Sequence, residues 1–156
     1  GCHLIIQPNG ILCGCGGRGC WERYGSATAL IQLARLEMER DRSSEMWTIV
    51  DGDSFKVSGR TPFQAARLGD AAAKRVLHNY LQGLSVGMIN LVNILQPEII
   101  CLGGGVSNAE DDLLLDPLRE LVWRGCFDKE NKVRIEKASL GNNAGVVGAA
   151  LLCNLV

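Results

Sequence analysis

Residues 98–107 have the sequence EIICLGGGVS, an apolar run that ends in three consecutive glycines. The composition of 98–102 predicts a buried strand, and the glycines at 103–105 allow the chain to turn tightly after it. The pattern that follows predicts a helix over 108–123. A strand, a turn and a helix in this order form one unit of an α/β fold.

Predicted helices and strands continue on both sides of this unit. Asp70 is the expected N-cap of a long helix that Pro97 ends, and Thr61, followed by proline, is the expected N-cap of a shorter one. The polar segment 43–59 is expected to be a surface excursion. Helices are predicted over 21–41, 61–69, 70–95, 108–123 and 146–155, and strands over 3–7, 98–102 and 132–137. Strands separated by helices, with no repeat and no linker, predict a single α/β domain over 1–156.

The overall composition excludes two classes of protein. Hydrophobic residues make up 47% and charged residues 21% of the chain, as in ordinary globular proteins. A formal net charge of −1 argues against nucleic acid as the partner, because phosphate binding needs a basic surface. The most apolar segment, 84–95, contains Asn90 and Asn93, so we expect a buried helix there and not a membrane span. No secretory signal is visible, and the expected location is the cytoplasm.

The chain has seven cysteines, four of them in its first twenty residues. An odd number without a secretory signal is poor support for a disulfide framework. Cys101 lies in an apolar strand pattern and Cys153 in an apolar helix pattern, and both are expected to be small buried hydrophobic residues.

A metal site is the favoured interpretation of the N-terminal cysteines. Three cysteines and one histidine are a standard ligand set for a structural Zn²⁺ ion, and the intervening glycines let the backbone wrap closely around it. The predicted ligands of this zinc loop, residues 3–20, are His3, Cys13, Cys15 and Cys20.

Other interpretations of the cluster are weaker. Cys13 and Cys15 are too close in sequence to form a comfortable disulfide, and the Cys-x-x-Cys spacing of redox motifs is absent. Cys2 competes with His3 as a ligand on sequence grounds. His78 lies within a helix pattern and is expected to be an ordinary surface or packing residue.

Several motifs together resemble one known family. Residues 3–22, HLIIQPNGILCGCGGRGCWE, resemble the zinc-binding segment of the ROK family (repressors, open reading frames and sugar kinases). Four further segments resemble the glucokinase branch of that family: SATAL at 26–30, GRTPFQAARLGD at 59–70, NLVNILQPEIICLGGGVS at 90–107 and LGNNAGVVGAA at 140–150. The resemblance covers nearly the whole chain.

The resemblance implies an actin/hexokinase-like (ribonuclease H-like) fold of two α/β domains, with sugar and ATP in the cleft between them. This chain would be the C-terminal domain, with the N-terminal domain absent. The catalytic aspartate and the phosphate-binding segments of the family would lie upstream of Gly1, so no catalytic residue is expected here. Cys2 stands where the family usually has glycine, and Asn143 where it commonly has aspartate.

The resemblance also implies roles for particular residues. His3 would face the sugar as well as the zinc ion, and Glu22 would accept hydrogen bonds from sugar hydroxyls. A glutamate in the first turn of a helix is also favoured by the helix dipole, and both explanations of Glu22 can hold together. The implied nucleotide-binding residues are Gly103, Gly104, Gly105, Gly141 and Gly145.

The complete protein would transfer the γ-phosphoryl group of ATP, bound with Mg²⁺, to a hexose hydroxyl. The chain alone would be inactive, because the catalytic base is upstream. A sugar-sensing domain of a ROK repressor is the alternative, and a zinc-stabilised module that acts through dimerisation is a third. The choice between glucose and a related hexose stays open, and a homo-oligomer is expected because such assemblies are usual in the family.

Overall fold

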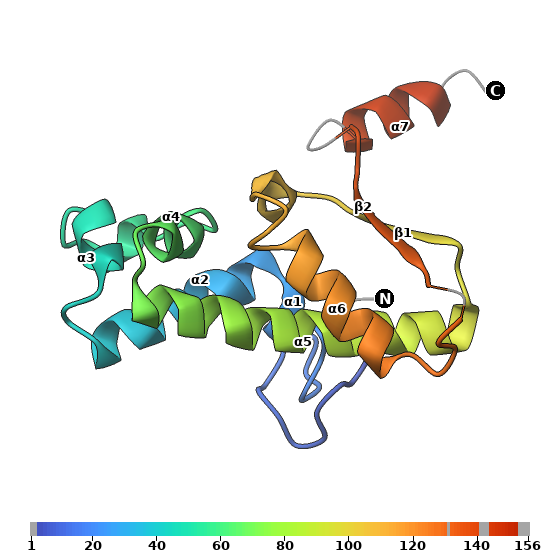
Figure 1. The fold of residues 1–156 in the computed structure, drawn as a ribbon, viewed down its shortest axis with the longest axis horizontal. Helices are drawn as coiled ribbons and strands as arrows, with labels where there is room; N and C mark the ends of the chain where they lie inside the picture. The colour runs from blue at the N-terminus through green and yellow to red at the C-terminus, as the bar shows by residue number, and fades with distance from the viewer. Residues whose placement is uncertain (1–2, 131, 141–143, 153–156) are drawn as a thin grey trace.

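The computed structural model describes residues 3–130, 132–140 and 144–152, and it combines helices with a small parallel sheet (Figure 1). The α-helices are α1 (Glu22–Gly25), α2 (Ala27–Arg40), α3 (Glu45–Ile49), α4 (Thr61–Arg67), α5 (Ala71–Leu95), α6 (Leu115–Gly125) and α7 (Ala144–Leu152). The strands are β1 (Ile99–Leu102) and β2 (Arg134–Lys137), and two short 3₁₀ helices are η1 (Ser54–Lys56) and η2 (Gly105–Asn108).

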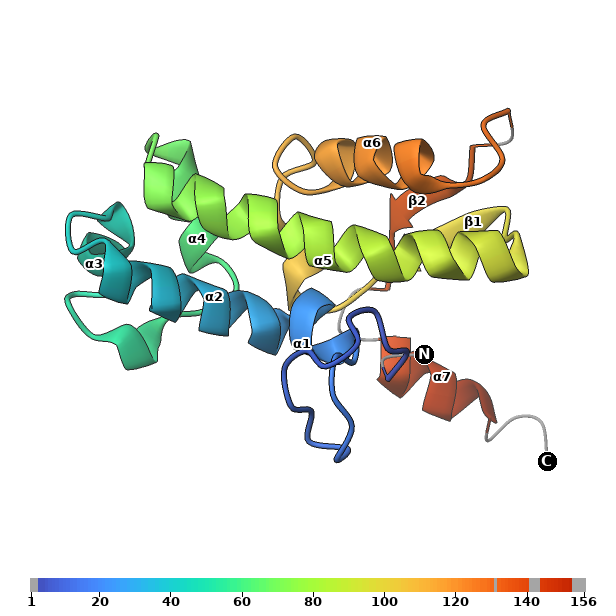
Figure 2. The same ribbon diagram turned by 90° about the horizontal axis from the view of Figure 1, so that it is seen from below.

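The long helix α5 is the central element of the fold. Its first turn is capped by Asp70, whose side chain accepts a hydrogen bond from the Ala73 backbone N–H at 2.6 Å. It ends at Leu95, where Gln96 takes a left-handed conformation before Pro97. The predicted helix over 70–95 is thus confirmed. Figure 2 shows α6 on one side of α5 and α2 on the other.

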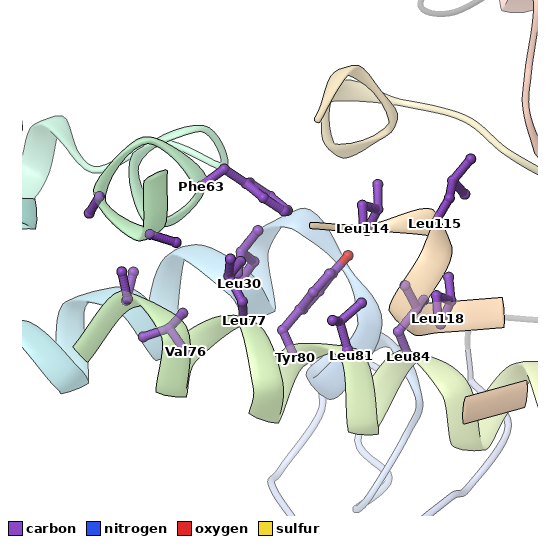
Figure 3. Close-up of a cluster of buried hydrophobic side chains, with 14 of the residues drawn as sticks. Leu30, Phe63, Val76, Leu77, Tyr80, Leu81, Leu84, Leu114, Leu115 and Leu118 are labelled. Carbon is purple, nitrogen blue, oxygen red and sulfur yellow. The ribbon is translucent and has the colours of Figure 1, made fainter. Parts of the chain in front are cut away.

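The hydrophobic core lies where the other helices meet α5. Figure 3 shows Tyr80, Leu81 and Leu84 of α5 close to Leu118 of α6, with Phe63 projecting from α4 toward the same region. Leu118 is completely buried. Its position in this apolar cluster explains why α6 and α5 stay in contact. Within the described residues, the helices are all too short or too polar to cross a membrane.

The sheet confirms the α/β class. β1 and β2 pair in parallel, with Ile100 opposite Ile135, and α6 lies between them in the chain. A parallel pair needs such a crossover, because its strands run in the same direction. Arg119 of α6 donates two hydrogen bonds to the carbonyl oxygen of Ile135 and so holds the helix against β2.

The predicted helix over 108–123 starts later than expected. α6 begins at Leu115, and after η2 the chain is irregular at 109–110 and forms turns over 111–114. Lys137 of β2 donates a hydrogen bond to the carbonyl oxygen of Ala109 and pairs with Asp111, both at 2.6 Å. These tertiary contacts hold the segment out of the helix.

Three further predictions about secondary structure were wrong. No strand forms over 3–7, where only an isolated bridge joins Ile5 to Cys20, because Pro8 and a left-handed Asn9 turn the chain at once. The expected helix over 21–41 is interrupted at Ser26, which adopts an extended conformation and caps α2. Thr61 is the first residue of α4 and not its N-cap.

Two predictions about burial also need correction. Segment 43–59 is not a simple surface excursion, because it contains α3 and η1 and buries Met46, Val50 and Val57. The strand expected to be buried over 98–102 forms as β1, but its residues alternate between exposed and half-buried, and Cys101 is exposed, since a two-stranded sheet leaves one face of β1 open. Cys153 lies outside the described residues.

A glycine in α5 permits close contact with the segment that leads into α1. A Cβ atom at Gly87 would lie 2.1 Å from Cε2 of Trp21. Alanine is favoured over glycine in a helix by about 1 kcal/mol. A loss of stability in the alanine variant would therefore come from the clash with Trp21 and not from helix propensity. We expect Gly87→Ala to lower the free energy of unfolding by roughly 1–3 kcal/mol in a denaturant titration. Gly148→Ala in α7, where a Cβ meets nothing within 4 Å, is the control and should cost no stability.

Candidate functional site

The N-terminal loop, residues 3–20, projects from the helical body next to α1 (Figures 1 and 2). Backbone hydrogen bonds close it at both ends: the Trp21 N–H donates to the carbonyl oxygen of Leu4 at 2.8 Å, and the Cys13 N–H donates to that of Gly17 at 2.8 Å. Gly19 has a φ of +74°, and a Cβ there would lie 1.7 Å from the carbonyl oxygen of Gln7. The fold of the loop therefore requires glycine at this position.

The four predicted metal ligands come together in this loop. One ligand atom from each of His3, Cys13, Cys15 and Cys20 lies within 4.8 Å of all the others. Cys13 Sγ is 3.6 Å from His3 Nδ1, and Cys15 Sγ is 3.6 Å from Cys20 Sγ. Zn–S bonds of about 2.3 Å in a tetrahedral site place sulfur atoms roughly 3.8 Å apart, so the cluster has the dimensions to hold such an ion.

The electrostatics of the thiols also suit a cation. Burial, with contributions from Cys15 and Cys13, raises the pKa of Cys20 to about 11. A hydrogen bond with the Gly17 backbone, followed by those with Cys20 and Cys13, lowers the pKa of Cys15. A bound metal ion would replace the thiol protons and neutralise the crowded sulfur atoms. Cys2 lies outside the described residues.

Glu22 follows the last cysteine of this cluster closely in the chain, at the start of α1. The bridge between Ile5 and Cys20 is antiparallel, and the Trp21–Leu4 hydrogen bond continues the same register. Trp21 has helical backbone angles, so the pairing ends there and Glu22 follows it as the first residue of α1. Glu22 begins α1 and is half-buried, and its side chain makes no hydrogen bond or ion pair with the described residues. Its carboxylate remains available as a hydrogen-bond acceptor.

Tyr24 braces the loop and was not singled out from the sequence. Its hydroxyl accepts a hydrogen bond from the Ile11 backbone N–H at 3.0 Å. Its backbone and Cβ approach Gly83 of α5 so closely that a Cβ at Gly83 would lie 2.8 Å away. Tyr24 thus connects the loop to the central helix. His78 is exposed on α5 and does not belong to the metal cluster.

The glycine turn after β1 borders two cavities. Gly104 has a φ of +82°, which explains why the turn needs glycine there. One cavity, of about 290 Å³, is also lined by Gly25, Ser26 and Tyr80. Of the other glycines implied as nucleotide-binding residues, Gly145 lies in α7 and Gly141 falls outside the described residues.

The second cavity, of about 270 Å³, lies between α4 and the segment 105–113. Phe63, Val106 and Leu113 give it an apolar lining, whereas the charged groups along it come from Arg60, Arg67 and Glu110. Apolar walls with a few polar groups are typical of small-molecule sites. This cavity was not predicted from the sequence. The two arginines of GRTPFQAAR, Arg60 and Arg67, lie at the two ends of one predicted helix and could have indicated a charged site there.

Comparison with known proteins gives consistent matches. The ROK family model matches residues 2–155. A glucokinase from Streptomyces coelicolor is 35% identical over 95% of this chain and 48% of its own length. The crystal structure of a ROK family glucokinase from Streptomyces griseus in complex with glucose and AMPPNP has a TM-score of 0.86 and 33% identity, covering 97% of this chain and 49% of that one. A putative xylose repressor from Caldicellulosiruptor is 29% identical over 96% of this chain and 37% of its own. The chain therefore spans about half the length of the glucokinases that it matches.

The conformation of Gly19 gives a direct test of the loop. Because an added Cβ would collide with the Gln7 carbonyl, Gly19→Ala should open the loop and weaken metal binding sharply. Gly14→Ala is the control, since a Cβ at Gly14 meets nothing within 4 Å. Elemental analysis should find about one metal ion per chain in the parent and in Gly14→Ala, and well under half of that in Gly19→Ala. Full retention by Gly19→Ala would contradict this account of the loop.

Proposed function

Because this chain belongs to the ROK family, we propose that it is the C-terminal part of an ATP-dependent hexose kinase of the glucokinase type. The observation that carries the proposal is the likeness over 97% of the chain to a glucokinase whose structure holds glucose and AMPPNP. The loop that carries His3 leads directly into α1 with Glu22, and two cavities lie beside the glycine turn. These features support the proposal, because they offer one region for a polyol and another for a nucleotide.

The N-terminal cluster is proposed as a structural zinc site held by His3, Cys13, Cys15 and Cys20. Three thiolates and an imidazole are donors that zinc prefers. Since Nδ1 of His3 is the nitrogen near Cys13, the Nε2–H group is left free to donate a hydrogen bond to a sugar hydroxyl. Zinc supplies rigidity to the loop, and the sugar contact belongs to the protein.

Glu22 is proposed as the complementary acceptor. An ionised carboxylate only accepts hydrogen bonds, so it suits the hydroxyl donors of a sugar. Its position after Cys20 ties it to the loop, and Tyr24 fixes the same segment against α5. A donor at His3 and an acceptor at Glu22 would orient one edge of the hexose ring.

The nucleotide is proposed to bind along Gly103–Gly105 and in the neighbouring cavity between α4 and 105–113. Because glycine has no Cβ, it leaves the backbone open to close approach, and the apolar lining suits the flat base. In the complete protein, Mg²⁺ would neutralise phosphate charge, and transfer would depend on positioning the hydroxyl in line with the γ-phosphoryl group. The carboxylate base is predicted upstream of Gly1.

A sugar-sensing domain of a repressor is the second candidate, favoured by the 29% identity to a putative xylose repressor. Such a domain needs the sugar contacts but no ATP. ATP binding therefore separates the two functions: a kinase must bind sugar and ATP, whereas a repressor domain need bind only the sugar. Homo-oligomer assembly and a cytoplasmic location remain predictions in both cases.

The sugar role of Glu22 can be tested by Glu22→Gln. This change removes the charge but keeps the size of the side chain, and a hydrogen bond to a charged group is worth about 1.5–3 kcal/mol. We expect the Kd for glucose to rise roughly tenfold or more in calorimetric titration, with metal content unchanged. Glu39→Gln, at an exposed position of α2, should leave the Kd unchanged. An unaltered Kd in Glu22→Gln would remove Glu22 from the sugar site.

The location of the catalytic base predicts a second result. The 156-residue chain, given glucose and Mg-ATP, should show no sustained phosphorylation in a coupled assay. The full-length protein with its upstream residues should turn over at on the order of 1–100 per second, as kinases do. Turnover of that size by the chain alone would show that the base lies within it.

A further inference from the structure

Arg67 joins the two walls of the cavity between α4 and 105–113. Its Nη2 atom contacts the carboxylates of both Glu110 and Asp112, the latter at 2.5 Å. Arg67 and Glu110 themselves line the cavity. Among the described side chains and backbone groups, these are the only hydrogen bonds or ion pairs that link α4 to the segment 105–113.

The other side of this segment is held by β2. Lys137 binds the carbonyl oxygen of Ala109 and the carboxylate of Asp111. The segment is therefore fixed to the sheet by Lys137 and to α4 by Arg67. Without Arg67, no hydrogen bond or ion pair between the described groups would join the two walls of the cavity.

The ion pairs are poorly placed to stabilise the fold as a whole. The side chains of Arg67, Glu110 and Asp112 are 43%, 69% and 55% exposed, and exposed ion pairs contribute little to the free energy of unfolding. Hydrogen bonding to Asp112 nevertheless raises the pKa of Arg67, and the same contact lowers the pKa of Asp112, so both groups stay charged near neutral pH. Ion pairs of this kind are therefore better suited to setting the local distance between α4 and the segment 105–113 than to stabilising the hydrophobic core.

The segment is continuous with the glycine turn. The Ser107 hydroxyl donates to the carbonyl oxygen of Gly104 at 2.7 Å, and its backbone N–H donates to the same oxygen at 3.2 Å. Ser107 is buried. A displacement of 109–113 away from α4 would therefore be carried to the Gly103–Gly105 turn through η2.

We propose that Arg67 is a positioning residue: by pairing with Glu110 and Asp112 across the cavity, it holds the cavity at the width of a nucleotide base and so sets the affinity for adenine nucleotides. This inference rests on the proposed nucleotide site. Its physical basis is that the apparent affinity of a ligand falls in proportion to the fraction of protein in the binding-competent form. In this proposal, Arg67 raises the fraction of protein whose cavity can accept the base, and it makes no direct contact with the phosphates.

The chain offers a matched control for this idea. Arg75 of α5 is also half-exposed and also pairs with two carboxylates, those of Glu37 and Asp41, at 2.5 and 3.2 Å. It lines neither of the two cavities beside the glycine turn. Arg67→Gln and Arg75→Gln each remove one double ion pair, but only the first lies at the proposed site.

The experiment measures the Kd of adenosine and of ATP by NMR titration of the chain and of both variants. Adenosine carries no charge, so its binding reports the shape of the cavity without direct attraction to the guanidinium. We expect Arg67→Gln to weaken both ligands by the same factor, about fivefold, and Arg75→Gln to weaken neither. Arg67→Lys, which keeps the charge but loses the forked geometry, should fall between the parent and Arg67→Gln. High salt should weaken adenosine binding to the parent but not to Arg67→Gln, because salt screens exposed ion pairs.

Each of the other outcomes would contradict the proposal, and each would do so for a different reason. If Arg67→Gln weakens ATP but not adenosine, Arg67 contacts phosphate directly and the positioning role is wrong. If it changes neither Kd, or if Arg75→Gln has the same effect, the inference fails while the proposed kinase function stands. If the parent binds neither ligand, the proposed nucleotide site itself fails, and the inference with it.

Discussion

The burial of α5 is the constraint on which the other elements depend. Helices α1, α2, α4 and α6 all pack directly on it, and glycines at Gly83 and Gly87 let α1 and the preceding Trp21 approach its backbone. These close contacts fix α1 against α5. The N-terminal loop leads directly into α1, so its position is fixed together with that of α1. The central helix thereby sets the positions of the candidate sugar contacts and of the nucleotide cavity at the same time.

The two candidate sites meet at one wall. Gly25 and Ser26, which follow Glu22 by one turn, line the same cavity as the Gly103–Gly105 turn. The Tyr80 hydroxyl donates to the carbonyl oxygen of Gly25 at 3.0 Å, and burial raises the pKa of Tyr80 to about 12, so it remains a donor at neutral pH. A kinase needs its two substrates side by side, and in this fold a single buried tyrosine holds the end of one site against the start of the other.

The sequence was informative where the signals are local. Asp70 and Pro97 mark both ends of the long helix, and the spacing of three cysteines after His3 predicted four possible metal ligands, which the fold does bring together. It was misleading where distant residues decide. Lys137 keeps the chain out of a helix until Leu115, and the open face of β1 exposes Cys101. Arg67 was missed for the same reason, since its partners lie more than forty residues away in the chain.

A division between a sugar site and a nucleotide site, as proposed, would account for the likeness of this chain to both glucokinases and repressors. In the proposed roles, His3 and Glu22 would orient a sugar without performing any chemistry, so sensing and catalysis would place the same demand on them. If the cavity between α4 and 105–113 binds a nucleotide, as proposed, a domain that only senses sugar would not need it. The two carboxylates opposite Arg67 are exposed and add little to the free energy of unfolding. A repressor domain that does not bind ATP would therefore have no need of them. The charge pattern around that cavity is therefore a better guide to the choice between the two functions than the metal loop.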